Sequence, residues 1–239
     1  DLDKLKTIIE SNEPDFIFHL AAQSLVRESY EKPVETFTTN IVGTVNILES
    51  IRNSSGVKGC IIYTTDKTYE NIGIAHNYNE NDRLGGGDPY SGSKAASEIV
   101  SSVYRDSFFN KPDSPKIATI RAGNVIGGGD WAKDRLIPDF VRAATNKQKI
   151  QVRNPEHTRP WQFVLEPISG ILWLAAKMVN EQKFSEAWNY GPPLNREQFT
   201  VRMILNEISK EWDDAVTIIE EKNKEELHED EFLNIDSTK

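Results

Sequence analysis

Three short apolar runs that alternate with helical segments constrain the fold of this chain more than any other feature. Apolar runs of this length are typical of strands whose two faces are both covered. They lie at residues 15–20, 58–64 and 116–121. The helices predicted between and before them, from apolar residues three or four apart, cover residues 2–11, 33–51 and 90–109. This order indicates an α/β fold, a Rossmann-like doubly wound parallel sheet.

The pattern becomes less regular beyond Gly123, which suggests a second and smaller lobe. The elements predicted there are helices over residues 136–145, 166–179 and 200–212, and strands over residues 150–153, 162–165, 187–190 and 215–219. The acidic run at residues 220–231 is interpreted as a solvated helix face or loop.

Composition excludes several classes of protein. The chain has 28 Lys and Arg against 37 Asp and Glu, a net charge of −9, so an overall basic surface for nucleic acid is excluded. No stretch approaches the roughly 20 apolar residues of a membrane helix. The single cysteine, Cys60, lies in an apolar run where a buried, unreactive thiol is expected. A reducing, cytoplasmic setting follows as the expectation.

Small or polar residues follow each of the three strands predicted first. In open α/β sheets, ligands bind beyond the carboxyl ends of the strands, so these residues are candidates for a site. They are Ala21, Ala22 and Gln23 after the first strand, Thr65, Asp66 and Lys67 after the second, and Gly123 and Asn124 after the third.

A tyrosine and a lysine four residues apart open the helix predicted over residues 90–109. The spacing places Tyr90 and Lys94 on one face of that helix. An ammonium near a phenol favours the phenolate and is expected to lower a pKa that is otherwise about 10. Such a tyrosine can act as a general base. The spacing is common by chance, and its specificity comes from its place one strand–helix unit after Thr65.

Five segments in this order resemble the extended short-chain dehydrogenase/reductase superfamily. They are His19–Gln23, Thr39–Thr44, Thr64–Lys67, Asp88–Lys94 and Arg121–Gly127. Within the superfamily, residues 121–131 and 153–162 resemble the CDP-glucose 4,6-dehydratase family. The likeness runs from Asp1 to about Pro193 and continues weakly to the end.

The resemblance implies a lyase that uses NAD to convert CDP-glucose to CDP-4-keto-6-deoxyglucose. Oxidation at C4, loss of water across C5 and C6, and reduction at C6 make up the cycle. Tyr90 would take the proton of the 4-hydroxyl, Thr65 would share the hydrogen bond to that oxygen, and Lys94 would hold the phenolate and the nicotinamide ribose. Asp66 would be the acid for the leaving hydroxyl if burial keeps it protonated. Lys67 would be the base at C5 if burial keeps it neutral.

The resemblance also assigns the binding residues and the two parts of the chain. Cofactor contacts would come from Ala21, Ala22, Gln23, Asn40, Thr64, Tyr90 and Lys94. Substrate contacts would come from Asn124, Arg135 and Arg159, which concentrate positive or polar groups around a diphosphate. Residues 1–124 and 161–191 would form a partial NAD-binding domain, and residues 125–160 and 192–239 a nucleotide-sugar-binding lobe.

The family likeness further suggests a homodimer through the helices at residues 33–51 and 90–109, packed as a four-helix bundle. No metal is expected, because His157 has no second ligand at a suitable spacing. Cytosine, uracil and thymine remain open as the base recognised.

The glycine-rich turn that holds NAD in this superfamily is missing from the sequence. Neither Gly-x-Gly-x-x-Gly nor Gly-x-x-Gly-x-x-Gly occurs, and the glycines at 85–87 and 127–129 have the wrong spacing. We therefore expect the fold to lack its N-terminal strand and turn. The 239-residue chain alone is expected to bind NAD poorly and to be inactive.

Two alternatives remain open at this stage. One is another nucleotide-sugar member of the superfamily, a UDP-sugar epimerase or decarboxylase. Asp66 argues against it, because epimerisation needs no acid for a leaving hydroxyl. The other is a non-catalytic nucleotide-sugar-binding relative. Tyr90 and Lys94 argue against that, because a protein that only binds has no use for a phenolate.

Overall fold

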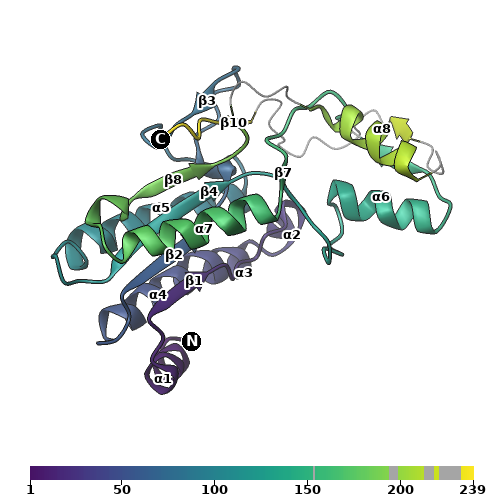
Figure 1. The fold of residues 1–239 in the computed structure, drawn as a ribbon. Helices are drawn as coiled ribbons and strands as arrows, with labels where there is room; N and C mark the ends of the chain where they lie inside the picture. Colours follow the sequence, from purple (N-terminus) through teal and green to yellow (C-terminus); the bar gives the residue numbers. More distant parts are fainter. Residues whose placement is uncertain (153, 194–198, 213–217, 221–232) are drawn as a thin grey trace.

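A four-stranded parallel sheet forms the centre of the molecule in the computed structural model (Figure 1). In order across the sheet its strands are β1 (Phe16–His19), β2 (Gly59–Tyr63), β4 (Lys116–Ala122) and β8 (Ala187–Tyr190). All three neighbouring pairs are parallel, so the strands end at one common edge. The structure describes residues 1–152, 154–193, 199–212, 218–220 and 233–239.

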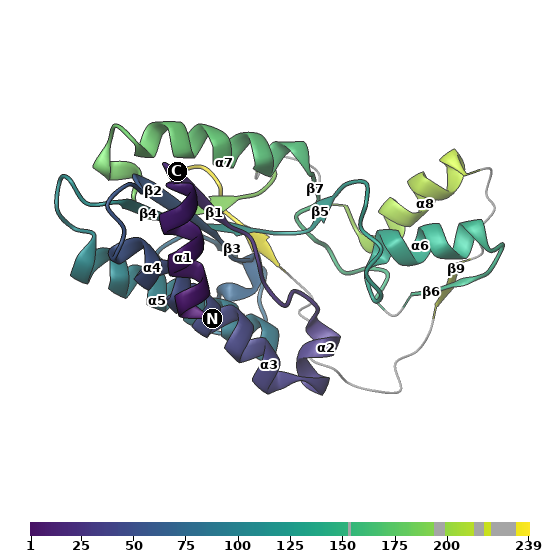
Figure 2. The same ribbon diagram turned by 90° about the horizontal axis from the view of Figure 1, so that it is seen from below.

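Helices cover both faces of this sheet and form two apolar cores. Cys60 and Ile62 of β2 pack in one core with α1 (Leu2–Asn12), α4 (Gly43–Arg52) and α5 (Pro89–Phe108). Ile61 packs in the other core with α7 (Leu165–Met178). Figure 2 shows α7 on one side of the strands and α4 and α5 on the other. Successive side chains of a strand point to opposite faces, so double coverage explains the nearly continuous apolar runs. The predicted α/β, Rossmann-like class is confirmed.

The helix predicted over residues 33–51 is divided into three parts. These are α3 (Pro33–Phe37), one π-helical turn η1 (Thr38–Val42) and α4. In that turn the amide of Gly43 donates to the carbonyl of Thr38, five residues back. The wider turn places the side chain of Asn40 inside the protein, with 2% of its surface exposed. A short helix before it, α2 (Val26–Glu31), was not predicted, because six residues carry little periodicity.

A separate small core lies away from the sheet. Helices α6 (Leu136–Thr145) and α8 (Val201–Glu211) pack there with β6 (Ile150–Val152), which pairs in parallel with β9 (Ile218–Glu220). Phe140 and Leu205, both fully buried, belong to this core. Figures 1 and 2 both show α6 and α8 beside each other and beyond the end of the strands. The smaller lobe expected beyond Gly123 therefore has a hydrophobic core of its own.

Short elements connect the lobe to the sheet. Strand β5 (Val125–Ile126) pairs with β7 (Gln162–Phe163). The predicted strand at 162–165 is thus too long. Residue 165 already belongs to α7, and the carboxylate of Glu166 accepts a hydrogen bond of 2.8 Å from the amide of Phe163. Two 3-10 turns lie elsewhere, η2 (Asp66–Thr68) after β2 and η3 (Gln182–Phe184) between α7 and β8.

The last described residues return to the larger unit. Strand β10 (Asn234–Ile235) pairs in parallel with β3 (Asn77–Tyr78). The side chain of Asn189 in β8 donates to the carbonyl of Asp236 over 2.9 Å. Residues 233–239 thus lie beside the sheet, although the sequence interpretation grouped them with the lobe.

The other predicted helices and strands agree with the structure to within about two residues at each end. Parts of three predictions lie outside the described residues. They are position 153 of the strand at 150–153, positions 215–217 of the strand at 215–219, and positions 221–231 of the acidic run. Among the described helices, none has both the length and the apolar character that a membrane crossing requires.

Candidate active site

The carboxyl edge of the sheet and the start of α5 meet where the predicted site residues lie. Thr64, Thr65 and Asp66 follow β2, and the turn η2 packs against α5. The side chain of Asp88 caps α5 by accepting a hydrogen bond of 2.9 Å from the amide of Ser91. Pro89 occupies the first helical position, which favours a helix start. Tyr90 is therefore fixed at the first turn.

Tyr90 is buried and hydrogen-bonded to Thr65. Burial raises the pKa of Tyr90 to about 12, against the effects of that hydrogen bond and of the Arg135 charge. The expectation that Lys94 lowers the Tyr90 pKa is wrong for this structure. The Lys94 ammonium instead donates a hydrogen bond of 2.9 Å to the carbonyl of Tyr63.

Lys94 is itself buried, and burial lowers its pKa to about 8, although the nearby Glu98 carboxylate acts in the opposite direction. His19, at the end of β1, has a pKa lowered to about 4, first by burial and then by the Lys94 charge. His19 is therefore a neutral neighbour of Lys94 near pH 7.

Asp66 is almost fully buried, and burial raises the pKa of its carboxyl above the ordinary value. The charges of Lys67 and Arg159 and a hydrogen bond from Thr65 oppose this effect. The Thr65 hydroxyl donates to Oδ1 over 2.9 Å, whereas Oδ2 has no hydrogen-bond partner among the described residues. A raised pKa is the direction needed by a carboxyl group that gives up a proton.

Gly123 permits the close packing around Asp66. A Cβ atom at position 123 would lie 2.4 Å from Oδ2 of Asp66 and 2.4 Å from Cγ of Pro160. Any side chain there would displace one of these groups. The residue after β4 is therefore small because the acidic side chain of Asp66 occupies the adjacent space.

Lys67 lies at the opening of this region. Its side chain is half-buried, and it lines a cavity of about 360 Å³ with Ser91 and residues 83–87. Gly86 of this loop lies close to α5, since a Cβ atom on it would meet the amide nitrogen of Gly92 at 2.3 Å. Lys67 is thus beside both Asp66 and a space large enough for part of a ligand.

Asn40 connects the loop after β1 to the helix α5. Its side chain accepts a hydrogen bond of 2.9 Å from the amide of Gln23 and donates to the carbonyl of the same residue over 3.0 Å. It also donates to the Ser93 hydroxyl over 2.8 Å. Ala21 and Ala22, just before Gln23, offer small side chains at the strand end, with Ala21 exposed.

Two arginines reach the same region from the lobe side. Arg135 bonds Asp130 over 3.0 Å and the Ser24 hydroxyl over 2.8 Å, and its charge acts on Tyr90. Arg159 is buried, and its charge acts on Asp66. Asn124 is half-buried, and its carbonyl accepts from the amide of Gln162 over 3.0 Å. Each cation therefore acts on one of the two titratable groups proposed for proton transfer, Arg135 on Tyr90 and Arg159 on Asp66.

Thr64 differs from the other predicted contacts because its hydroxyl is used inside the protein. It lies 2.5 Å from a carboxylate oxygen of Glu98 and 2.9 Å from the carbonyl of Ile120. The sequence interpretation did not single out Glu98. The signal was available, because position 98 lies one turn after Lys94 on the same face of α5. In the described part of the chain, no group of three or more His, Cys, Asp or Glu could hold a metal.

Replacement of Asp66 by asparagine is expected to change how stability depends on pH. A carboxyl whose folded pKa is raised contributes its full stability below the unfolded pKa, about 3.9, and loses it as the pH rises through the folded pKa. Asparagine cannot ionise. The free energy of unfolding of Asp66→Asn relative to the parent should therefore increase as the pH rises above about 4.

Urea unfolding at several pH values measures this difference. The exposed substitution Asp113→Asn removes the same charge and serves as the control. Parallel pH profiles for the parent and Asp66→Asn would show that the carboxyl is not shifted.

Known proteins resemble the chain in sequence. CDP-glucose 4,6-dehydratase from Salmonella typhimurium (strain LT2) is 45% identical over 245 aligned residues, which cover 100% of this chain and 67% of that protein. dTDP-D-glucose 4,6-dehydratase from Dictyostelium discoideum is 29% identical, over 71% of this chain and 40% of that protein. The chain thus spans about two thirds of the first relative's length and less than half of the second's.

Solved structures share the fold. A dTDP-glucose 4,6-dehydratase from Streptomyces venezuelae, solved with NAD and TYD bound, superposes with a TM-score of 0.82 at 22% identity. That match covers 99% of this chain and 68% of the other. A UDP-glucose 4-epimerase from Thermotoga maritima, solved with UDP-glucose, has a TM-score of 0.81 at 20% identity, over 100% and 73% of the two chains. A family model described as GDP-mannose 4,6 dehydratase matches residues 1–238, so the chain belongs to the GDP-mannose 4,6-dehydratase family.

Proposed function

We propose that the protein is a lyase that dehydrates CDP-glucose to CDP-4-keto-6-deoxyglucose with NAD as cofactor. One observation carries the proposal, a buried carboxyl group of raised pKa, Asp66, within hydrogen-bond distance of Thr65, the residue that also bonds Tyr90. The 45% identity to the Salmonella CDP-glucose 4,6-dehydratase supports the same reaction.

The residues at the carboxyl edge of the sheet fit the nicotinamide end of NAD. Lys94 uses one of its three N–H bonds on the Tyr63 carbonyl, which leaves others for hydroxyl groups of a ribose. Ala21 and Ala22 leave room for a flat group, and Asn40 fixes the backbone of Gln23 beside them. A bound NAD supplies a hydride acceptor and later a hydride donor.

Tyr90 and Thr65 act on the 4-hydroxyl of the sugar in this proposal. Tyr90 must be a phenolate to accept the proton. The Arg135 charge and the hydrogen bond with Thr65 both lower the Tyr90 pKa and so oppose the effect of burial.

Asp66 and Lys67 divide the loss of water between them. Lys67 takes the proton from C5 on its side-chain amine, the bonding electrons form the C5–C6 double bond, and the C6–O bond breaks. Asp66 gives its proton to the departing hydroxyl, which leaves as water. The group buried more deeply is thus the acid, and the half-buried amine is the base.

Local positive charge holds the nucleotide diphosphate against the net charge of −9. Arg135 and Arg159 provide the cations, and Asn124 provides an amide donor at the end of β4. We place the cofactor on residues 1–124 and 161–191 and the nucleotide sugar on residues 125–160 and 192–239, of which residues 233–239 lie beside the sheet. The separate core around Phe140 and Leu205 supports this division.

Two other functions give different expectations for the same residues. A UDP-sugar epimerase or decarboxylase is compatible with the fold, but neither needs an acid for a departing hydroxyl. A non-catalytic nucleotide-sugar-binding protein would have no use for Tyr90 and Lys94 as a buried pair on one helix face.

The full-length protein with NAD should convert CDP-glucose, and not UDP-glucose, to a 4-keto sugar. The ketone is measured by its absorbance after alkali treatment. Tyr90→Phe should retain nucleotide-sugar binding and lose turnover by about two orders of magnitude or more, because proton transfer is removed. Unchanged turnover in Tyr90→Phe, or conversion of UDP-glucose alone, would contradict the proposal.

Lys67→Met should separate the two halves of the reaction. The variant keeps Tyr90 and Lys94, so C4 oxidation should still reduce the cofactor, which is seen as absorbance of the reduced nicotinamide. Exchange of the C5 hydrogen with deuterated water, followed by mass spectrometry, should be lost. Lys67→Arg, which keeps a charge without a readily neutral amine, is the matched control and should show the same block. Full dehydration by Lys67→Met would remove Lys67 from the mechanism.

We also propose a homodimer through α3, η1, α4 and α5. Large apolar side chains are exposed on these helices, which favours burial against a second copy. They include Val34, Val42, Ile99 and Val103.

A cytoplasmic setting is part of the same proposal. Burial raises the pKa of the Cys60 thiol to about 12, so this cysteine stays unreactive.

Val103→Asp should convert the dimer to a monomer, because it places a charge in the proposed contact. Light scattering after size-exclusion chromatography gives the mass. Ile74→Asp, at a position with 58% exposure outside these helices, is the control and should leave the mass unchanged. A monomeric parent protein would exclude the dimer.

A further inference from the structure

Glu98 is a buried carboxylate that the proposed reaction does not use. It lies on α5 with 2% of its surface exposed. Position 98 is one helical turn beyond Lys94, so both side chains leave the same face of the helix. A buried acidic residue is costly unless its oxygens are satisfied. Its partners therefore indicate what it holds in place.

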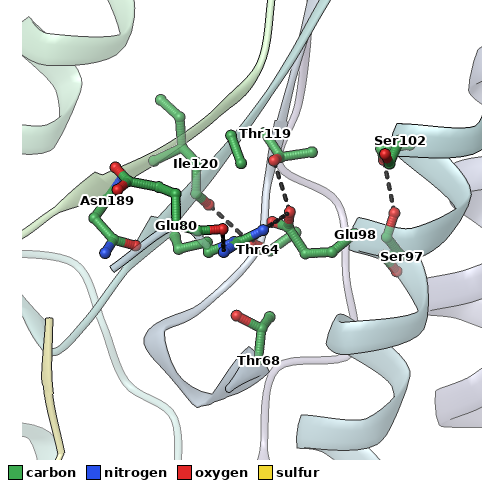
Figure 3. Close-up of polar contacts among 12 residues, drawn as sticks. Thr64, Thr68, Glu80, Ser97, Glu98, Ser102, Thr119, Ile120 and Asn189 are labelled. Carbon is green, nitrogen blue, oxygen red and sulfur yellow. Dashed lines mark hydrogen bonds and ion pairs between the residues drawn. The ribbon is translucent and has the colours of Figure 1, made fainter. Parts of the chain in front are cut away.

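Three groups of the sheet bind the Glu98 carboxylate. The Thr64 hydroxyl of the segment after β2 lies 2.5 Å from Oε1. In β4, the Thr119 hydroxyl donates to Oε2 over 2.7 Å and the Arg121 guanidinium over 2.9 Å. Figure 3 shows the Glu98 side chain extending from α5 to Thr64 and Thr119. One side chain thus joins the catalytic helix to two central strands.

Lys94 and Glu98 hold consecutive residues of one chain segment. Lys94 donates to the carbonyl of Tyr63, and Glu98 accepts from the hydroxyl of Thr64. Thr65, the partner of Tyr90, is the next residue. Two successive turns of α5 therefore bind the end of β2, which is followed by Thr65 and its proposed catalytic hydroxyl. A shift of either contact would move Tyr90 relative to Thr65.

We propose that Glu98 is a positioning residue for the reaction, which fixes Thr64 in the segment that binds Lys94 and keeps a negative charge one helical turn from the Lys94 ammonium. The inference rests on the proposed function. Arg121 is the counter-ion that makes a buried Glu98 tolerable, because breaking such a pair leaves an uncompensated charge.

None of the other titratable groups described around Lys94 favours a negative charge that could stabilise its ammonium, as the carboxylate of Glu98 does. His19, on β1, has a pKa of about 4 and is uncharged near pH 7. Burial raises the pKa values of Tyr63, Asp66 and Tyr90, which disfavours their anionic forms. Burial lowers the pKa of Lys94 to about 8, and the Glu98 carboxylate counteracts that decrease. Without Glu98 the ammonium would lose its proton at a lower pH.

Glu98→Gln tests the inference in the full-length protein, because it keeps the shape and removes the charge. The ¹³C NMR signal of the Lys94 ε-carbon reports its protonation without substrate, and Lys94→Arg assigns the signal. The titration midpoint of Lys94 should fall by about one pH unit, since an opposite charge nearby shifts a pKa by that order. The pH at which turnover declines on the alkaline side should decrease together with this midpoint.

Tyr69→Phe is the matched control. The Tyr69 hydroxyl accepts a hydrogen bond of 3.0 Å from Arg121 and donates to Asn189 over 2.6 Å. Its removal damages the same buried network on the side away from Lys94 and changes no charge. This variant should lower thermal stability and leave the Lys94 midpoint where it is.

Glu98→Gln leaves Arg121 buried without its partner, so the variant could fail to fold. The double variant Glu98→Gln with Arg121→Gln keeps the core neutral and should show the same downward shift at Lys94. A folded variant of either kind with an unmoved Lys94 midpoint overturns the inference. A shifted midpoint in a protein that does not dehydrate CDP-glucose would instead overturn the proposed function and leave the electrostatic effect of Glu98 on Lys94 standing.

Discussion

Coverage of β2 and β4 by helices on both faces is the constraint on which the rest of the structure depends. Ile61 enters one core and Cys60 and Ile62 enter the other, so the strands have no solvated face for polar side chains. Polar groups are therefore placed where the strands end. This explains why Thr64, Thr65 and Asp66 come directly after the apolar residues of β2, and why α5 begins at the same edge.

Burial at that edge favours the neutral form of four titratable groups. It raises the pKa of Tyr90 and Asp66 and lowers that of Lys94 and His19. This effect keeps the Asp66 carboxyl protonated, as an acid requires. It disfavours the phenolate of Tyr90, which needs positive charge nearby before it can accept a proton. The same low-polarity surroundings thus favour the elimination and oppose the oxidation.

Much of the fold could be predicted from the sequence, because double coverage leaves continuous apolar strands and the Asp88 cap marks the start of α5. Tyr90, Lys94 and the residues after β2 could be found for the same reason. The π-helical turn around Asn40 could not, since the spacing of residues 38–42 does not distinguish it from an α-helical turn. The Lys94 ammonium donates to a backbone carbonyl of β2, a different element. The spacing of Tyr90 and Lys94 within α5 therefore predicts neither this contact nor the raised pKa of Tyr90.

The π-helical turn η1 also bears on how sequences of this kind can change in length. Its hydrogen bond spans one residue more than an α-helical bond, so one extra residue is accommodated between α3 and α4. Loss of a single residue there would restore an α-helical turn and keep α4 in phase with α3. The wider turn that holds Asn40 against Gln23 and Ser93 would disappear with it. Homologous chains that keep this asparagine should therefore also keep the length of residues 38–42.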